Sequence, residues 1–163
     1  MRILVFTEGT IIMHRGAAGH TRDKIVRQVE ENEESVHDFA SYVPIGNAVR
    51  KLVSWERGGA EILYLTSRRK HEEIESIRSV LKAYGFPEGR LLFRQRGKEY
   101  RDIAERIVPD ILVEDDCESI GGINEMTITQ VRPDVRNRIK SITVREFRGI
   151  DHLPENTRTL LEY

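Results

Sequence analysis

The first twelve residues, MRILVFTEGTII (1–12), decide the fold. An apolar run from Ile3 to Phe6 stops at an acid and a glycine between two threonines, and apolar residues resume at Ile11. A short and nearly continuous apolar run is typical of a strand that is buried on both faces of a sheet. The polar residues after it then lie at the carboxyl end of that strand, which is where open parallel sheets bind ligands.

The same pattern recurs along the chain. Four further β-rich apolar runs predict strands at Glu61–Thr66, Leu91–Phe93, Asp110–Val113 and Ile142–Phe147. Amphipathic stretches with helical spacing lie between them, at Pro44–Arg57, His71–Tyr84 and Lys98–Ile107. Strands that alternate with helices predict right-handed crossovers and helices on both faces of one sheet. We therefore expect a three-layer α/β/α sandwich around a five-stranded parallel sheet.

Two regions interrupt this alternation. Residues 13–43 form a small insertion after the first strand, with a helix expected from Thr21 and an acidic run at 30–35. Residues 117–140 contain a glycine-bearing loop and an arginine-rich stretch. No repeat, low-complexity linker or second core is evident. We therefore expect residues 1–163 to form a single domain with a small cap-like insertion at about 13–43.

Composition and charge exclude several classes of function. The formal net charge is −1 and the isoelectric point is about 6.5, so no global basic field attracts nucleic acid or acidic membranes. The arginine-rich stretch 132–148 has no interleaved aromatic platform and is interpreted as a solvated face. No apolar stretch approaches the roughly 20 residues of a membrane-spanning helix, and no signal-peptide pattern precedes the first strand. These features predict a soluble cytoplasmic protein.

Other motifs offer little chemistry. The only cysteine, Cys117, excludes an internal disulfide and zinc sites built from several thiolates. It also follows Asp116, and nearby carboxylates raise a thiol pKa, which argues against a nucleophile. The segment HRGAAGH (14–20) lacks the Gly-Lys-Ser/Thr ending of a phosphate-binding P-loop. The five histidines show no zinc-binding spacing.

Polar residues after the other strands have two interpretations each. Three adjacent carboxylates at 114–116 repel one another, which a hard cation such as Mg²⁺ would relieve, but they could also form a solvated turn that caps a helix. Thr66 and Ser67, followed by cations at 68–70, form either a phosphate cradle or a helix N-cap. Lys98, taken alone, is an ordinary surface lysine.

Together these pieces resemble the haloacid dehalogenase-like superfamily of phosphatases and phosphotransferases, whose fold is Rossmannoid. FTEGT (6–10) lies over the family's first motif, Asp-x-Asp-Gly-Thr. YLTSR (64–68) matches the second motif, Lys98 is placed for the third, and LVEDD (112–116) matches the fourth. The resemblance covers most of the chain and implies an Mg²⁺ site and a phosphorylated small-molecule ligand, with no nucleic acid expected.

The first motif departs from the family pattern. The family's nucleophilic aspartate, which also binds Mg²⁺, falls on Phe6, and its general acid/base falls on Glu8. Sliding the match by one residue puts Thr7 at the nucleophile position, but Gly9 then replaces the acid. The covalent aspartyl-phosphate route is therefore closed in either register.

Two functions remain open from the sequence. The first is a divergent Mg²⁺-dependent phosphohydrolase or phosphotransferase without the usual nucleophile. The resemblance then implies that Glu8 is catalytic and that Glu8, Asp115 and Asp116 bind metal. It also implies ligand contacts by Thr10, Thr66, Ser67, Arg68 and Lys98. The second is a catalytically inactive binding or regulatory protein, which Phe6 favours. The retained acids and Lys98 favour the first. The oligomeric state is not readable from the sequence.

Overall fold

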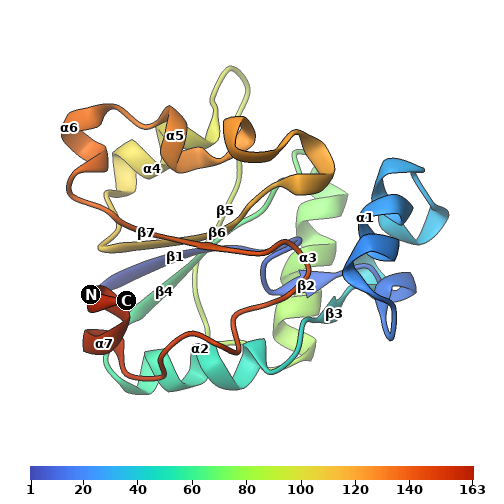
Figure 1. The fold of residues 1–163 in the computed structure, drawn as a ribbon, viewed down its shortest axis with the longest axis horizontal. Helices are drawn as coiled ribbons and strands as arrows, with labels where there is room; N and C mark the ends of the chain where they lie inside the picture. The colour runs from blue at the N-terminus through green and yellow to red at the C-terminus, as the bar shows by residue number, and fades with distance from the viewer.

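The computed structural model describes residues 1–163 and contains a five-stranded sheet in the order β5-β4-β1-β6-β7 (Figure 1). Every pair of neighbouring strands is parallel. The strands are β1 (Arg2–Phe6), β4 (Glu61–Leu65), β5 (Leu91–Leu92), β6 (Ile111–Asp115) and β7 (Lys140–Val144). The first strand of the sequence lies at the centre, so its carboxyl end is flanked by the ends of β4 and β6. The predicted parallel sheet is confirmed.

Helices cover both faces of the sheet. One face packs against α2 (Ala48–Arg57), α3 (His71–Ala83) and α7 (Thr157–Glu162), and the other against α4 (Tyr100–Ile107), α5 (Thr127–Gln130) and α6 (Pro133–Arg136). Alternate residues of β1 supply the two cores, because successive side chains of a strand point to opposite faces. Ile3 and Val5 belong to the first core and Leu4 to the second. The three-layer prediction is confirmed.

A second, small sheet joins the two ends of the insertion that follows β1. Strand β2 (Ile12–Met13) pairs antiparallel with β3 (Val43–Pro44), which brings the two ends of the 13–43 insertion together. The helix α1 (Arg22–Glu30) lies within the insertion and begins after Thr21, as the sequence predicts. The insertion stands beside the carboxyl ends of the central strands (Figure 1).

Several boundaries differ from the sequence prediction. Strand β6 runs on to Asp115, so Glu114 and Asp115 belong to the strand and not to a turn after it. Strand β7 ends at Val144, which leaves Glu146 in the following loop. Helix α4 begins at Tyr100, after Lys98. Element ends are set by hydrogen bonds to neighbouring strands and caps, and apolar periodicity does not report these.

Residues 117–140, for which the sequence indicates a glycine-bearing loop and an arginine-rich stretch, also contain short helices. They contain two short 3-10 turns, at Glu118–Ile120 and Gly122–Glu125, and then α5 and α6. None of the helices combines the length and apolar character that crossing a membrane requires.

Candidate functional site

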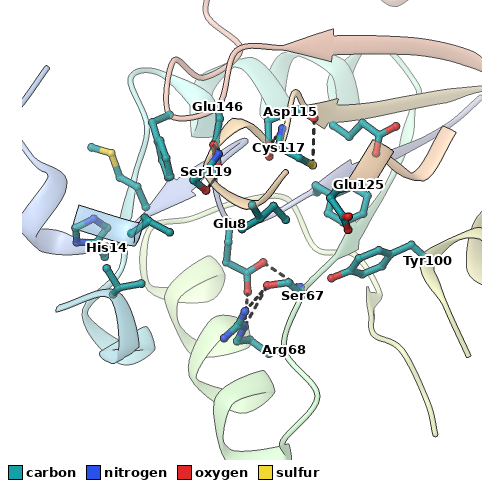
Figure 2. Close-up of a pocket in the computed structure, with 18 of the residues that line it drawn as sticks. Glu8, His14, Ser67, Arg68, Tyr100, Asp115, Cys117, Ser119, Glu125 and Glu146 are labelled. Atoms are coloured by element: carbon teal, nitrogen blue, oxygen red, sulfur yellow. Dashed lines mark hydrogen bonds and ion pairs between the residues drawn. The ribbon is translucent and has the colours of Figure 1, made fainter. Parts of the chain in front are cut away.

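A cavity of about 430 Å³ opens at the carboxyl ends of the central strands. Its volume lies in the usual range of small-molecule sites, roughly 300–1,000 Å³. Both polar and aromatic side chains line it, from the β1 loop, the 13–43 insertion, the β4, β5 and β6 ends and the loop after β7. Figure 2 shows ten of these residues labelled around the central Glu8. The cavity lies where strand-end chemistry predicts a site.

The Glu8 carboxylate points toward the end of β4 (Figure 2). Its Oε1 accepts a hydrogen bond from the Thr66 hydroxyl at 2.5 Å. Its Oε2 accepts from the Thr7 hydroxyl at 2.5 Å and from the Ser67 backbone N–H at 3.2 Å. Arg68 Nε lies 3.6 Å from Oε1. We call these donors on Thr7, Thr66, Ser67 and Arg68 the β4 cradle.

Two arginines lie at this end of the cavity and pair with Glu8 and Glu99. Arg68 lies over the ring of Phe39, with its guanidinium carbon 4.5 Å from the ring centroid. Arg94, which follows β5, lies 4.0 Å over the ring of Tyr100. The Arg94 guanidinium lines the cavity and donates to Glu99 and to the Ser67 backbone carbonyl, each at 3.4 Å. Stacking on aromatic rings holds both planar cations in place.

The opposite end of the cavity is acidic. One oxygen from each of Asp115, Asp116 and Glu146 lies within 4.8 Å of the others. Asp115 accepts hydrogen bonds from the Thr10 hydroxyl at 2.8 Å and from the Cys117 backbone N–H at 2.9 Å. Glu146 is held by the backbone N–H and the hydroxyl of Ser119. We call Asp115, Asp116 and Glu146 the acidic group.

An arginine from the insertion contacts this acidic group. Arg22 donates from its terminal nitrogen to both oxygens of Asp116 at 3.3 Å and pairs with Glu118. Its Nε donates to the backbone carbonyl of Glu146 at 3.0 Å. The Arg22 side chain is only 8% exposed, so this cation is committed to the contact. The insertion is therefore tied to the site by a charged side chain.

Burial dominates the electrostatics of the acids. It raises the pKa of Glu146 to about 7 and of Glu114 to about 6, and it raises the pKa of Asp115. Glu114 accepts hydrogen bonds from the backbone N–H groups of Thr127 and Ile128, at the start of α5, which oppose the rise. A buried carboxylate resists ionisation unless a cation or donor compensates it. The acidic group therefore favours a positive partner.

Burial also raises the pKa of the Cys117 thiol, and the charge of Asp115 adds to the rise. A thiol that resists ionisation is a poor nucleophile. This agrees with the sequence argument against Cys117 as a catalytic residue.

Backbone geometry around the acidic group is tight. Gly9 has φ +81°, and a Cβ there would lie 3.0 Å from Asp115 Oδ2, so this turn requires glycine. Phe147 and Cys117 also have left-handed backbones, which cost energy for residues with side chains. The Phe147 N–H donates to the Gly9 carbonyl at 2.7 Å, which joins the β7 loop to the β1 loop. The strained residues flank the acids that line the cavity.

The end of β1 carries an aromatic ring. Phe6 lines the cavity and packs edge-to-face against Tyr100, with ring centroids 5.0 Å apart. The next residue, Thr7, has a hydroxyl, but it is fully buried and donates to Glu8 and to the Leu65 carbonyl. The end of β1 therefore offers no carboxylate at Phe6 or Thr7.

The structure brings only some of the predicted residues to the cavity. Glu8, Ser67, Arg68 and Asp115 line it. Thr66 and Thr10 are fully buried behind it and bond to Glu8 and to Asp115. Asp116 forms an ion pair with Arg22. Their roles in binding and catalysis remain predictions.

Two placements differ from expectation. Lys98 is exposed on the turn before α4 and does not line the cavity, because the helix begins two residues after it. Glu8 is not part of the acidic group, because its carboxylate is bonded to the β4 cradle.

Sequence reasoning missed three residues of the site. Arg94 and Glu146 each follow a strand by two residues, so the rule that ligands meet strand ends could have found both. Glu146 was concealed because β7 was predicted to continue to Phe147. Arg22 had no signal in the sequence, since its partners lie about a hundred residues away.

The sequence matches no known family model and no curated protein. The solved structures that match this chain include two of the Class C acid phosphatase from Bacillus anthracis. The one with tungstate bound is 13% identical, with a TM-score of 0.57 over 91% of this chain and 68% of that one. The other is 12% identical, with a TM-score of 0.58 over 99% of this chain and 77% of that one.

The chain has a haloacid dehalogenase-like fold. Class C acid phosphatases belong to that superfamily, so this likeness agrees with the resemblance seen in the motifs. At this level of identity the likeness is one of fold. The chemistry of the site depends on its own residues.

Proposed function

We propose that the cavity binds a phosphorylated small molecule in a protein that has lost the covalent aspartyl-phosphate chemistry of its fold. The observation that carries this proposal is Phe6: its ring lies at the end of β1, in the cavity that also contains the arginines. A phenyl ring has no lone pair with which to attack phosphorus. Recognition of an anion is thus retained where the nucleophile is lost.

The phosphate is expected at the β4 end of the cavity. The Ser67 N–H and the guanidinium groups of Arg68 and Arg94 are donors beside the same space. Guanidinium and backbone N–H groups are the usual partners of phosphate oxygens. One structural neighbour holds tungstate, an oxyanion of similar shape, which supports an oxyanion as the ligand class. The aromatic lining suits an apolar group on the rest of the ligand.

We also propose that Mg²⁺ accompanies the ligand, held by Asp115, Asp116 and Glu146. The donor chemistry fits, because three carboxylates supply hard oxygens within 4.8 Å of one another and two of them are buried. Glu146 then supplies the carboxylate that Phe6 has removed from the usual set. Such an ion would neutralise the acids. Arg22, which pairs with Asp116, would compete with the ion for that carboxylate.

A second function, phosphohydrolase or phosphotransferase, is favoured by one observation. The Glu8 carboxylate contacts the Ser67 N–H and Arg68, which are the expected phosphate donors. A carboxylate at that distance could act as acid or base toward a bound phosphate ester.

Binding and turnover are tested together. We expect inorganic phosphate and some members of a phosphomonoester panel to raise the melting temperature, with no hydrolysis above background in Mg²⁺. Arg68→Gln should abolish the stabilisation. Turnover that disappears in Glu8→Gln would establish the second function, whereas turnover that survives this change would indicate a contaminant or another site. The absence of any stabilisation by phosphate or phosphomonoesters at millimolar concentration would refute the binding proposal.

A further inference from the structure

The Glu8 carboxylate is surrounded by hydrogen-bond donors. Two hydroxyls and one backbone N–H donate to it, and a guanidinium lies 3.6 Å away. These are the donors of an oxyanion site, and a carboxylate of the chain itself occupies them. A surface acid of ordinary function does not collect four such partners.

The β4 cradle is preorganised around this anion. The Arg68 backbone N–H donates to the Thr66 hydroxyl oxygen at 3.1 Å, which orients the Thr66 proton toward Glu8. The Arg68 side chain donates to the Ser67 hydroxyl at 2.7 Å, which fixes the guanidinium over the loop. Thr66 is fully buried, so water does not replace its partner. A site of this kind is costly to leave empty.

The length of the side chain explains how Glu8 reaches the cradle. Strands β1 and β4 are neighbours in the sheet, with Phe6 opposite Leu65. Neighbouring strands lie about 4.8 Å apart, and Glu8 must span that gap from the loop after β1 to the loop after β4. Glutamate is one methylene longer than the aspartate that the family has at this position. The extra methylene extends the carboxylate toward the Ser67 N–H.

We infer that Glu8 is a built-in competitor for the phosphate position, which the ligand must displace. This inference rests on the proposed function, because it names the regulation of the same site. A tethered carboxylate acts at a high effective concentration, on the order of millimolar or above, so it lowers the apparent affinity for every oxyanion. Singly charged carboxylate ligands gain little by exchange with it. A phosphate monoester dianion brings a second charge and a third oxygen, and it is the class of ligand selected.

The test compares inorganic phosphate binding to matched variants by calorimetry. Glu8→Gln keeps the length of the side chain and removes its charge, and we expect phosphate to bind about tenfold tighter, the scale of one charged hydrogen bond lost to competition. Glu8→Asp should fall between the wild type and Glu8→Gln because it is too short. Glu125→Gln is the control, since Glu125 is an exposed acid of the same cavity outside the β4 cradle. It should change the affinity less than about twofold.

A second readout detects displacement directly. Glu8→Ala leaves the β4 cradle without an anion, so its melting temperature should fall in buffer and recover in phosphate by more than the wild type gains. The comparison remains informative if Glu8→Ala folds poorly in buffer, because phosphate should then restore its folding.

The outcomes separate the two proposals. If no variant binds phosphate or any phosphomonoester of the panel, the proposed function fails. If the wild type binds phosphate and Arg68→Gln does not, but Glu8→Gln binds no tighter than the wild type, the site stands and the competitor idea is wrong. Equal tightening in Glu8→Gln and Glu125→Gln would reduce the effect to general charge and would also refute the inference.

Discussion

Replacing Phe6 with aspartate tests whether the end of β1 still faces a metal site. Phe6 is partly buried against the apolar group on the α4 side of the sheet and contacts Tyr100 edge-on. The edge contact is worth about 0.5–1.5 kcal/mol, and the partial burial of the ring adds about 1 kcal/mol. With repulsion from the nearby acids included, we expect a loss of about 2–4 kcal/mol without metal.

For a chain of this length such a loss lowers the melting temperature by about 4–16 °C, at roughly 2–4 °C per kcal/mol. Mg²⁺ should then recover much of it, because an ion at 100 times its dissociation constant contributes about 2.7 kcal/mol. The gain arises because the new carboxylate joins Asp115 and Glu146, which line the same cavity.

The assay is thermal unfolding of wild type, Phe6→Asp and Phe6→Asn over a series of Mg²⁺ concentrations. Phe6→Asn is the matched control, since it loses the same ring and gains nearly the same volume without a charge. Mg²⁺ should raise the melting temperature of Phe6→Asp by more than that of Phe6→Asn or the wild type, and Phe6→Asp is also the variant in which phosphatase activity could appear with Glu8 as acid and base. Identical melting temperatures of the two variants at every Mg²⁺ concentration would refute the reasoning.

Two further predictions concern the insertion. Arg22→Gln removes the cation that pairs with Asp116 and Glu118, and we expect it to cost about 1–3 kcal/mol, less than a fully buried pair because these carboxylates are 33% and 52% exposed. Calorimetry should also show tighter Mg²⁺ binding by this variant, and unchanged stability together with unchanged metal binding would contradict the role given to Arg22. Burial lowers the pKa of His14 below its ordinary value of 6.5, an effect that the charge of Glu33 opposes and that of His20 reinforces. As the pH falls, the unfolded chain therefore takes up the proton first, and the stability of the folded protein should fall below pH 6.5. His14→Gln should reduce the change in melting temperature between pH 6.5 and pH 5. His37→Gln, at an exposed position of the same segment, should leave that change as it is in the wild type. An equal pH dependence in the two variants would show that His14 is not responsible.

The sheet was predictable because burial on both faces leaves a signature in every strand. Ile3 to Phe6 is apolar throughout, since both sides of β1 pack against helices, and the same holds for the core of β4. The polar residues at 7–10 and 66–68 marked the strand ends, and Thr7, Thr66 and Ser67 do meet around the Glu8 carboxylate. The burial of a strand is reflected in the apolar pattern of its own residues, so these features could be derived without the structure.

The ends of β6 and β7 could not be derived in the same way. Glu114 is an acid within a buried strand, which periodicity treats as a boundary, but the N–H groups at the start of α5 accommodate it there. Glu146 falls outside β7 because the pairing with β6 stops at Val144. In both cases the deciding partner lies in another part of the chain.

The sequence by itself determined the fold class and the strand ends that line the cavity. Only the tertiary structure decided which charges meet. Glu8 lies between two sets of partners, because β1 is flanked by β4 and β6, and it joins the donors of β4 instead of the acids of β6. Arg22 reaches Asp116 from an insertion without a periodic pattern to place it. Apolar periodicity follows from each residue's own burial, whereas a charge pair depends on the positions of two distant residues at once.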